Sequence, residues 1–241
     1  MMAPQSHGPA AWWRGAVLFD VDGTLVDSAY VHTLAWWQAF RQHNHDVPMA
    51  AIHWCVGMGG DRLVDRLLPA DRDRGADAGI LASHAAVFAA SWPSLRAFDG
   101  AKDLLAQCHA GGLAVALASS ARREDLAANR SALGADAFIH AATSSDDARE
   151  SKPAPDILVA ALDAVRVPAG HAVYVGDAVW DMKAAAALGI PAIGVTCGGR
   201  SAAELLEAGA AAVYAGPRDL LENLQASPIG HLLGLQTAQE S

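Results

Sequence analysis

Two carboxylates separated by a single residue follow an apolar run near the start of the chain. In segment 17–28, VLFDVDGTLVDS, Asp20 and Asp22 stand directly before Gly-Thr. If 16–20 is a strand of a parallel sheet, both carboxylates lie at its carboxyl end, where such sheets bind ligands, and on the same side. Carboxylates this close repel each other unless a cation separates them or one is protonated. The segment therefore predicts Mg²⁺ binding or acid–base chemistry, with a purely structural acidic turn as the alternative.

A second apolar run also ends in carboxylates. Segment 171–181, HAVYVGDAVWD, places Asp177 at the end of a predicted strand and Asp181 four residues later. In one sheet, Asp177 would share an edge with Asp20, and Asp181 would face the same way one helical turn on. The alternative is that Asp177 only caps the helix that follows. Beside the first motif, the second favours a site of several carboxylates.

Positive charge is scarce in this chain, and one lysine stands out. Only Lys102, Lys152 and Lys183 are present, and Lys152 lies in the stiff segment Ser-Lys-Pro-Ala-Pro-Asp. A site that joins Asp20 to an incoming phosphate needs a cation to balance the negative charge. Lys152 is the candidate, although a lysine before a helix is often only a solvated charge.

Serines follow the apolar run 113–118. The hydroxyl groups of Ser119 and Ser120, with nearby backbone N–H groups at the start of a helix, are suited to holding phosphate oxygens. Serine after a strand is common in α/β proteins, so this is the weakest of the four signals.

The elements that must position these residues alternate regularly. Short apolar runs bounded by glycines alternate with segments of helical periodicity, which predicts an α/β fold: a Rossmann-like, doubly wound parallel sheet with helices on both faces. The expected strands cover 16–20, 113–118, about 137–141, 171–176, 191–196 and 212–214. The expected helices cover 101–110, 123–133, 155–165, 179–188, one from Ser201 and one from about 217.

Residues 28–95 break this rhythm. They have helical periodicity at 29–43, about 61–68 and about 77–91, with a glycine-rich interruption at 57–60. We expect an inserted helical cap domain at 28–95 and a catalytic core formed by 15–27 and 96–226. Flexible tails are expected at 1–14 and 227–241.

The composition limits the possible partners. The formal charge is −9, and no run of Lys or Arg predicts a nucleic-acid partner. No segment has the roughly 20 apolar residues of a membrane helix, so no membrane partner is expected. Three scattered cysteines favour a reducing, cytoplasmic location. We expect a monomer or homodimer.

The four motifs occur in the order DxDGT, strand-end serine, Lys-Pro-x-Pro-Asp and GDxxxD. Together they resemble the haloacid dehalogenase (HAD) superfamily, over nearly the whole chain from Val17 to about Leu221. The helical insert is similar to the cap of the subgroup that contains phosphoglycolate phosphatases and β-phosphoglucomutases.

This resemblance implies a role for each position. Asp20 would be the nucleophile, and Asp22 would protonate the leaving oxygen and later activate water. Mg²⁺ would be held by Asp20, Asp177 and the backbone carbonyl of Asp22. Ser119, Ser120 and Lys152 would hold the phosphoryl group, and Asp181 would orient Lys152 or a metal-bound water. The expected enzyme is a Mg²⁺-dependent phosphatase that acts on a small phosphorylated metabolite.

Specificity would come from the cap and from the start of one core helix. The candidates for substrate contact are His32, Gly59, Arg62 and Arg122. The alternative is that each has only a packing, turn or surface role.

Single residues distinguish the expected phosphatase from other activities of the superfamily. Dehalogenases of the superfamily lack the second carboxylate, and phosphonatases need a cap lysine, whereas Asp22 is present and 28–95 contains no lysine. A sugar phosphomutase similar to β-phosphoglucomutase remains the alternative, since it uses the same Asp pair. A non-catalytic binding protein on the same fold is a third possibility.

Overall fold

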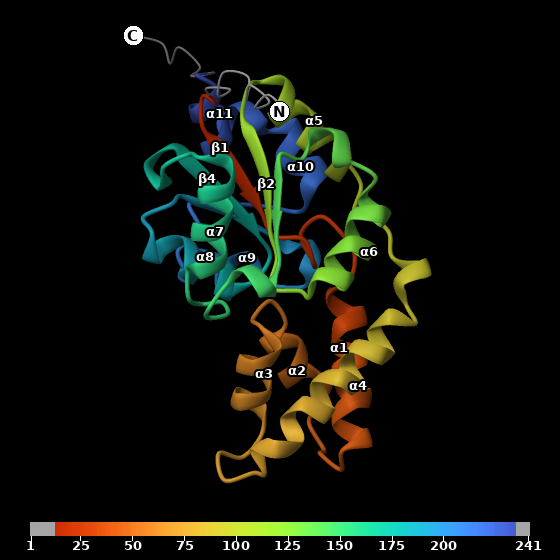
Figure 1. Cartoon of the computed structure of the whole chain (residues 1–241). Coiled ribbons are helices and arrows are strands. Elements are labelled where there is room, and N and C mark those ends of the chain that lie inside the picture. The colour runs from red at the N-terminus through yellow and green to blue at the C-terminus, as the bar shows by residue number, and fades with distance from the viewer. Residues whose placement is uncertain (1–12, 235–241) are drawn as a thin grey trace, which may run out of the picture.

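A six-stranded parallel sheet forms the centre of the molecule. The computed structural model describes residues 13–234, and the strands are β1 (Ala16–Phe19), β2 (Ala114–Ala118), β3 (Ala141–Thr143), β4 (Ala172–Gly176), β5 (Ala192–Val195) and β6 (Ala212–Tyr214) (Figure 1). Their order is β3-β2-β1-β4-β5-β6, and all neighbours are parallel. The order reverses between β1 and β4, which is the ligand-binding position of a doubly wound sheet. The predicted fold class is confirmed.

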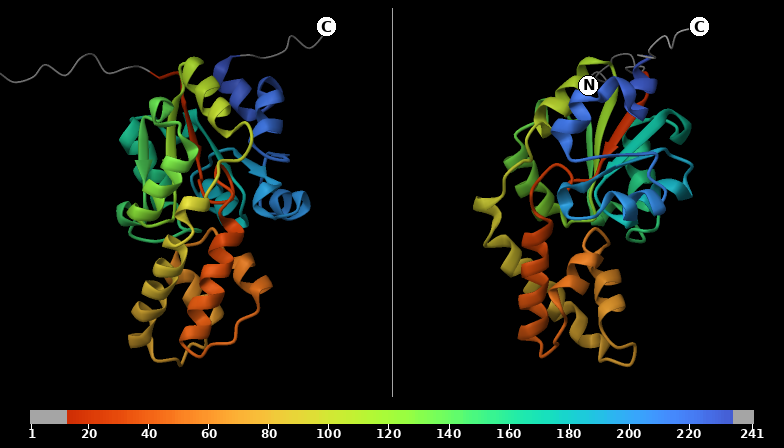
Figure 2. Two further views of the ribbon diagram at one scale, coloured as in Figure 1. Left: turned by 90° about the vertical axis from the view of Figure 1, so that its right-hand side faces the viewer. Right: turned by 180° about the vertical axis from the view of Figure 1, so that it is seen from behind.

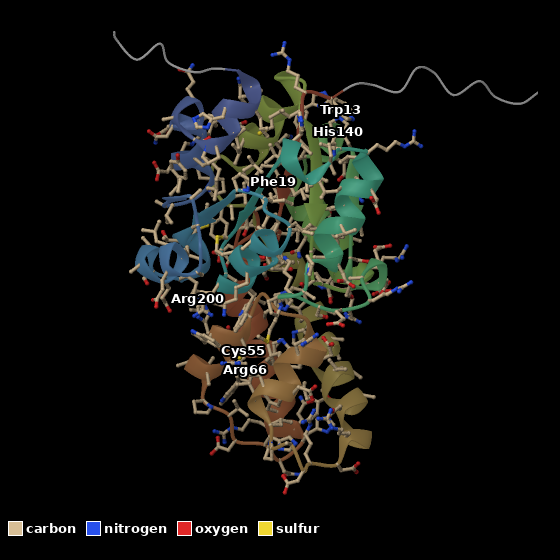
Figure 3. The ribbon with its side chains drawn as sticks, turned by 90° about the vertical axis from the view of Figure 1, so that its left-hand side faces the viewer. Trp13, Phe19, Cys55, Arg66, His140 and Arg200 are labelled. Atoms are coloured by element: carbon tan, nitrogen blue, oxygen red, sulfur yellow. The ribbon has the colours of Figure 1, made fainter. Side chains whose placement is uncertain are left out.

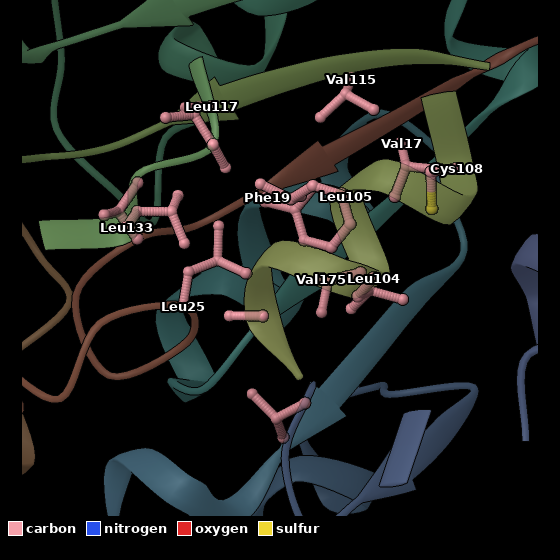
Figure 4. Close-up of a cluster of buried hydrophobic side chains, with 14 of the residues drawn as sticks. Val17, Phe19, Leu25, Leu104, Leu105, Cys108, Val115, Leu117, Leu133 and Val175 are labelled. Atoms are coloured by element: carbon pink, nitrogen blue, oxygen red, sulfur yellow. The ribbon is translucent and has the colours of Figure 1, made fainter. Parts of the chain in front are cut away.

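Helices cover both faces of this sheet. One face packs against α5 (Ala101–Ala110), α6 (Arg123–Leu133), α10 (Pro217–Glu222) and α11 (Pro228–Leu233). The other packs against α7 (Asp156–Val165), α8 (Val179–Ala187) and α9 (Ala202–Glu207). Figure 4 shows the first layer, in which Val17 and Phe19 of β1 meet Leu104 and Leu105 of α5. Since alternate residues of β1 serve opposite faces, every β1 side chain is buried.

Four helices form a separate body at one end of the sheet. They are α1 (Ala29–Gln42), α2 (Met49–Cys55), α3 (Gly60–Leu67) and α4 (Asp77–Ala89), and they lie beyond the point where β1 ends (Figures 1 and 2). An aromatic and aliphatic cluster that includes Trp36, Phe40 and Ile52 holds them together. We call these four helices the cap.

The cap also touches the core through α2. Arg200 donates to the backbone carbonyl of His53 (3.0 Å) and to that of Trp54, and the indole N–H of Trp180 donates to the carbonyl of Trp54 (3.3 Å). Figure 3 shows Arg200 on the core side of this junction, with Cys55 and Arg66 on the cap side. These bonds hold the cap over the carboxyl ends of the strands.

Three sequence expectations need correction. Residues Asp136–Phe138 form a 3₁₀ turn, so β3 covers Ala141–Thr143, whereas a strand at about 137–141 was expected. Helix α2 was not expected, because its seven residues are too few to show a periodicity. The segment after 227 contains α11, whose Ile229 and Leu233 are buried in the core, so it is not a tail up to Gly234. The remainder of both expected tails, 1–12 and 235–241, lies outside the described residues.

Candidate active site

Asp20 and Lys152 form a buried ion pair at the carboxyl end of β1. The Nζ of Lys152 lies 2.6 Å from Asp20 Oδ1 and also donates to the carbonyl of Ala118 (3.0 Å). Lys152 is fully buried and Asp20 is 3% exposed. Burial lowers the pKa of Lys152, but the carboxylates of Asp181 and Asp20 outweigh it, so that the pKa is raised and the amine stays charged.

Asp181 fixes this lysine from the other side. Its Oδ1 lies 2.9 Å from Lys152 Nζ and accepts a hydrogen bond from Tyr174 Oη (2.8 Å). Its Oδ2 accepts from the backbone N–H of Ala178 (3.0 Å) at the start of α8. Both oxygens are therefore engaged, which suits Asp181 for orienting Lys152 rather than for binding a substrate.

Three carboxylates gather without enough positive charge to balance them. One oxygen each of Asp20, Asp177 and Asp181 lies within 4.8 Å of the others, and all three residues are buried. Burial, offset in part by Lys152, raises the pKa of Asp20 to about 7, and burial together with Asp181 raises the pKa of Asp177 well above its usual range. Buried carboxylates with oxygens facing one another are a suitable donor set for a divalent cation.

The carboxylate of Asp22 points to a different set of partners. Its Oδ1 accepts from Ser28 Oγ (2.6 Å) and Asn129 Nδ2 (2.9 Å), and it lies 3.0 Å from His32 Nε2. Burial raises its pKa, but His32 and the hydrogen bonds lower it to about 2. Because β1 ends at Phe19, Asp22 sits in the turn beyond the strand. Its side chain is not part of the three-carboxylate group, so only its backbone carbonyl is suited to the metal role that the resemblance implies.

The two serines after β2 both keep a hydroxyl proton that can be donated to a ligand. Ser119 Oγ accepts from the backbone N–H of Ala121 (3.0 Å), which closes a local turn and leaves its own O–H available as a donor. Ser120 Oγ is buried, has no hydrogen-bond partner within residues 13–234, and lines the pocket described next. A buried donor without a partner is costly, so Ser120 is suited to bind a substrate oxygen there.

A pocket lies between the cap and the end of the sheet. Its core side is formed by Asp20, Asp22, Ser120, Ala121, Arg122 and Asp125. Its cap side is formed by His32, Trp36, Val56, Gly57, Met58, Gly60, Leu63 and His84. Of the four specificity candidates, His32 and Arg122 therefore border the pocket.

The other two candidates do not border the pocket themselves, although Gly59 lies between Met58 and Gly60, which do. Arg62 makes a salt bridge of 2.5 Å with Glu150, and Gly59 packs so closely against Ser151 that a Cβ on it would lie 2.0 Å from Ser151 Oγ. Their contacts join the start of α3 to the loop that carries Lys152, and substrate contact stays a prediction for both residues.

Several residues of the site were not singled out from the sequence. His84 of α4 lies 3.2 Å from His32 Nδ1, Asn129 of α6 donates to Asp22, and Thr24 donates to Asp177 Oδ1 (3.2 Å). His84 and Asn129 sit on helices whose periodicity shows only which face is buried. The signal that finds them is their burial, 8% and 0% exposed, which needs a three-dimensional structure.

The geometry agrees with a known family. Residues 15–189 match the haloacid dehalogenase-like hydrolase family, so the chain belongs to it. Relatives that are named phosphoglycolate phosphatases indicate the subgroup expected from the sequence.

Among curated proteins, the chain is 31% identical to a phosphoglycolate phosphatase of Yersinia pestis, over 76% of this chain and 81% of that protein. It is 33% identical to Protein SUPPRESSOR OF QUENCHING 1, chloroplastic, of Arabidopsis thaliana, over 75% of this chain but only 18% of that much longer protein. The family match and the phosphatase-named relatives support a phosphatase enzyme.

Solved structures share the fold. A hydrolase from Pseudomonas syringae is 31% identical, covers 88% of this chain and 98% of its own, and superposes with a TM-score of 0.84. A candidate β-phosphoglucomutase from Bacteroides vulgatus is 21% identical, covers 91% and 90%, and has a TM-score of 0.80. Among residues 13–234, no helix is both long and apolar enough to cross a bilayer.

Proposed function

We propose that the chain is a Mg²⁺-dependent phosphomonoesterase that acts on a small phosphorylated metabolite through an aspartyl-phosphate on Asp20. The observation that carries the proposal is the position of Asp20. It belongs to the three-carboxylate group, forms an ion pair with Lys152 at 2.6 Å and borders the pocket under the cap.

The carboxylate group fits the expected cation. Asp20 and Asp177 would hold Mg²⁺ with the backbone carbonyl of Asp22, because Asp181 is already bound to Lys152 and Tyr174. When bound, the ion would neutralise part of the negative charge that Asp20, Asp177 and the phosphate bring together. Burial raises the pKa values of Asp20 and Asp177, and a cation between the two carboxylates would oppose that rise because it favours their ionised forms.

In the first step, an Asp20 oxygen attacks phosphorus while the bond from phosphorus to the ester oxygen breaks. Lys152, Ser119 and Ser120 bind phosphoryl oxygens, and Asp22 gives a proton to the leaving alcohol. Asp22 is ionised in the free protein, but an approaching phosphate dianion raises its pKa and favours protonation.

In the second step, the Asp22 carboxylate takes a proton from water as that water attacks phosphorus. The bond from phosphorus to Asp20 breaks, and inorganic phosphate leaves. The hydrogen bonds from Ser28 and Asn129, with His32 beside them, keep Asp22 oriented through both steps.

Free cysteines at positions 55, 108 and 197 are compatible with a cytoplasmic site of action.

Asp20→Asn tests the proposal directly. The amide keeps the shape of the side chain but is a poor nucleophile, so phosphate release with Mg²⁺ should fall by at least about 1,000-fold. Asp27→Asn is the matched control, because Asp27 is an exposed carboxylate of the same loop and its change should leave turnover near that of the wild type. Thermal unfolding of both variants checks the fold. Undiminished release of phosphate by a folded Asp20→Asn protein would refute the assignment.

A further inference from the structure

The pocket has two walls of different chemistry. The cap wall presents apolar and aromatic side chains, with Trp36, Val56, Met58 and Leu63 facing the carboxylates of the core wall. Trp36 stacks on His84 with ring centroids 4.0 Å apart, and His32 stacks on Phe88 at 3.8 Å. A substrate body bound here therefore meets flat rings and aliphatic groups.

The cap wall offers no free positive charge. In the described part of the chain, no Lys or Arg of the cap borders the pocket. His84 is 8% exposed, and burial lowers its pKa well below the usual value, so its ring is neutral. His32 Nε2 faces Asp22, so any charge on that ring is compensated by the carboxylate.

The cations on the core side, Arg122 at the pocket and Lys152 beside Asp20, are already compensated. Arg122 binds Asp125 through two hydrogen bonds of 2.9 Å, and Asp125 is only 2% exposed. This bidentate pair has no net charge. Lys152 lies between Asp20 and Asp181 and serves the phosphoryl end of the site.

From these contacts we infer that the site selects phosphate monoesters whose remaining part is uncharged and largely apolar or aromatic, and discriminates against esters with a second anionic group. This inference rests on the proposed function. A carboxylate or second phosphate in this pocket would lose water without gaining an unpaired cation. An uncharged apolar or planar body instead gains contact with Trp36, Met58 and Leu63.

Isosteric substrate pairs test the inference. One pair is 2-phosphoglycolate and its amide, 2-phosphoglycolamide, and the other is 4-carboxyphenyl phosphate and 4-carbamoylphenyl phosphate. Within each pair the shape is kept and one charge is removed. With Mg²⁺ present, we expect kcat/KM to be at least about tenfold higher for the amide of each pair. Equal values, or a preference for the carboxylates, would overturn the inference.

Two substitutions test the cause. Asp125→Asn keeps the shape of the side chain but leaves the charge of Arg122 uncompensated, and Met58→Lys places a new cation on the cap wall. Either change should raise the carboxylate-to-amide ratio of kcat/KM severalfold, chiefly through a lower KM for the carboxylate. A purely structural effect would change both members of a pair alike, and that result would argue against electrostatic selection.

Binding separates this inference from the proposed function. Dissociation constants of all four compounds are measured with Mg²⁺ on the Asp20→Asn variant, which needs no turnover. If the wild type and Asp20→Asn release phosphate from these compounds at equal rates, the proposed function fails. The inference is then decided by whether the amides bind about tenfold more tightly than the carboxylates.

Discussion

At the scale of single residues, Asp20 has neighbours of both charges. Lys152 stabilises its ionised form, while burial and Asp181 act against it, and the net result is a pKa raised to about 7. Asp22, two residues on, has its pKa lowered to about 2 by His32 and hydrogen bonds that outweigh burial. The pKa values of two carboxyl groups that are two residues apart are thus shifted in opposite directions. Active sites commonly give similar groups different roles in this way.

These shifts make the stability of the metal-free protein depend on pH. A group whose pKa is raised on folding binds more protons in the folded state between its unfolded value, about 4, and its folded value, about 7 for Asp20. The unfolding free energy that this tighter proton binding contributes is fully present below pH 4 and is lost as the pH rises to 7. We expect Asp20 to remove on the order of 4 kcal/mol of unfolding free energy across this range.

Denaturant unfolding at pH 5 and pH 8 in the presence of a chelator, with wild type and Asp20→Asn side by side, isolates this contribution. The wild type should lose more stability with rising pH than the variant, and Mg²⁺ should restore it. Identical pH slopes for the two proteins would show that Asp20 ionises normally.

At the scale of elements, the site depends on where strands end. Strands β1, β2 and β4 place Asp20, Ser119 and Asp177 at one edge of the sheet, and the start of α8 adds Asp181. Such placement follows from strand order and was predictable from apolar runs. The short helices α2 and α11 were not predictable in the same way, because one turn or two shows no clear periodicity.

Helix α11 supplies a test of the corrected C-terminal boundary. Ile229 is fully buried in the core cluster beside the sheet. Replacing it with alanine removes buried methyl groups and leaves a cavity, so Ile229→Ala should cost about 2–5 kcal/mol of unfolding free energy. Leu206→Ala is the control, since Leu206 is 52% exposed and should change stability by no more than about 0.5 kcal/mol. Chemical denaturation measures both, and equal effects would mean that α11 does not pack on the core.

At the scale of the whole molecule, the sequence predicted the sheet, the inserted helical segment and the motif residues, because apolar runs and Asp-rich strand ends are local signals. Of the cap residues that border the pocket it singled out His32 but not His84, and Arg62, which it also singled out, does not border the pocket. Arg62 is turned toward Glu150, whereas His84 reaches His32 from a helix more than 50 residues away in the chain. Such pairings depend on how α1 and α4 pack, which no local pattern encodes.

In the proposed function, four segments that are distant in the sequence form one reaction centre, in which Asp20 is phosphorylated. Rapid acid quench of the wild-type protein with Mg²⁺ and a phosphate ester, followed by peptide mass spectrometry, tests it most directly. We predict phosphate on the peptide that contains Asp20 within the first turnover, and none on the same peptide from Asp20→Asn. Phosphate on another residue, or turnover without a phosphorylated protein at any time point, would contradict the account.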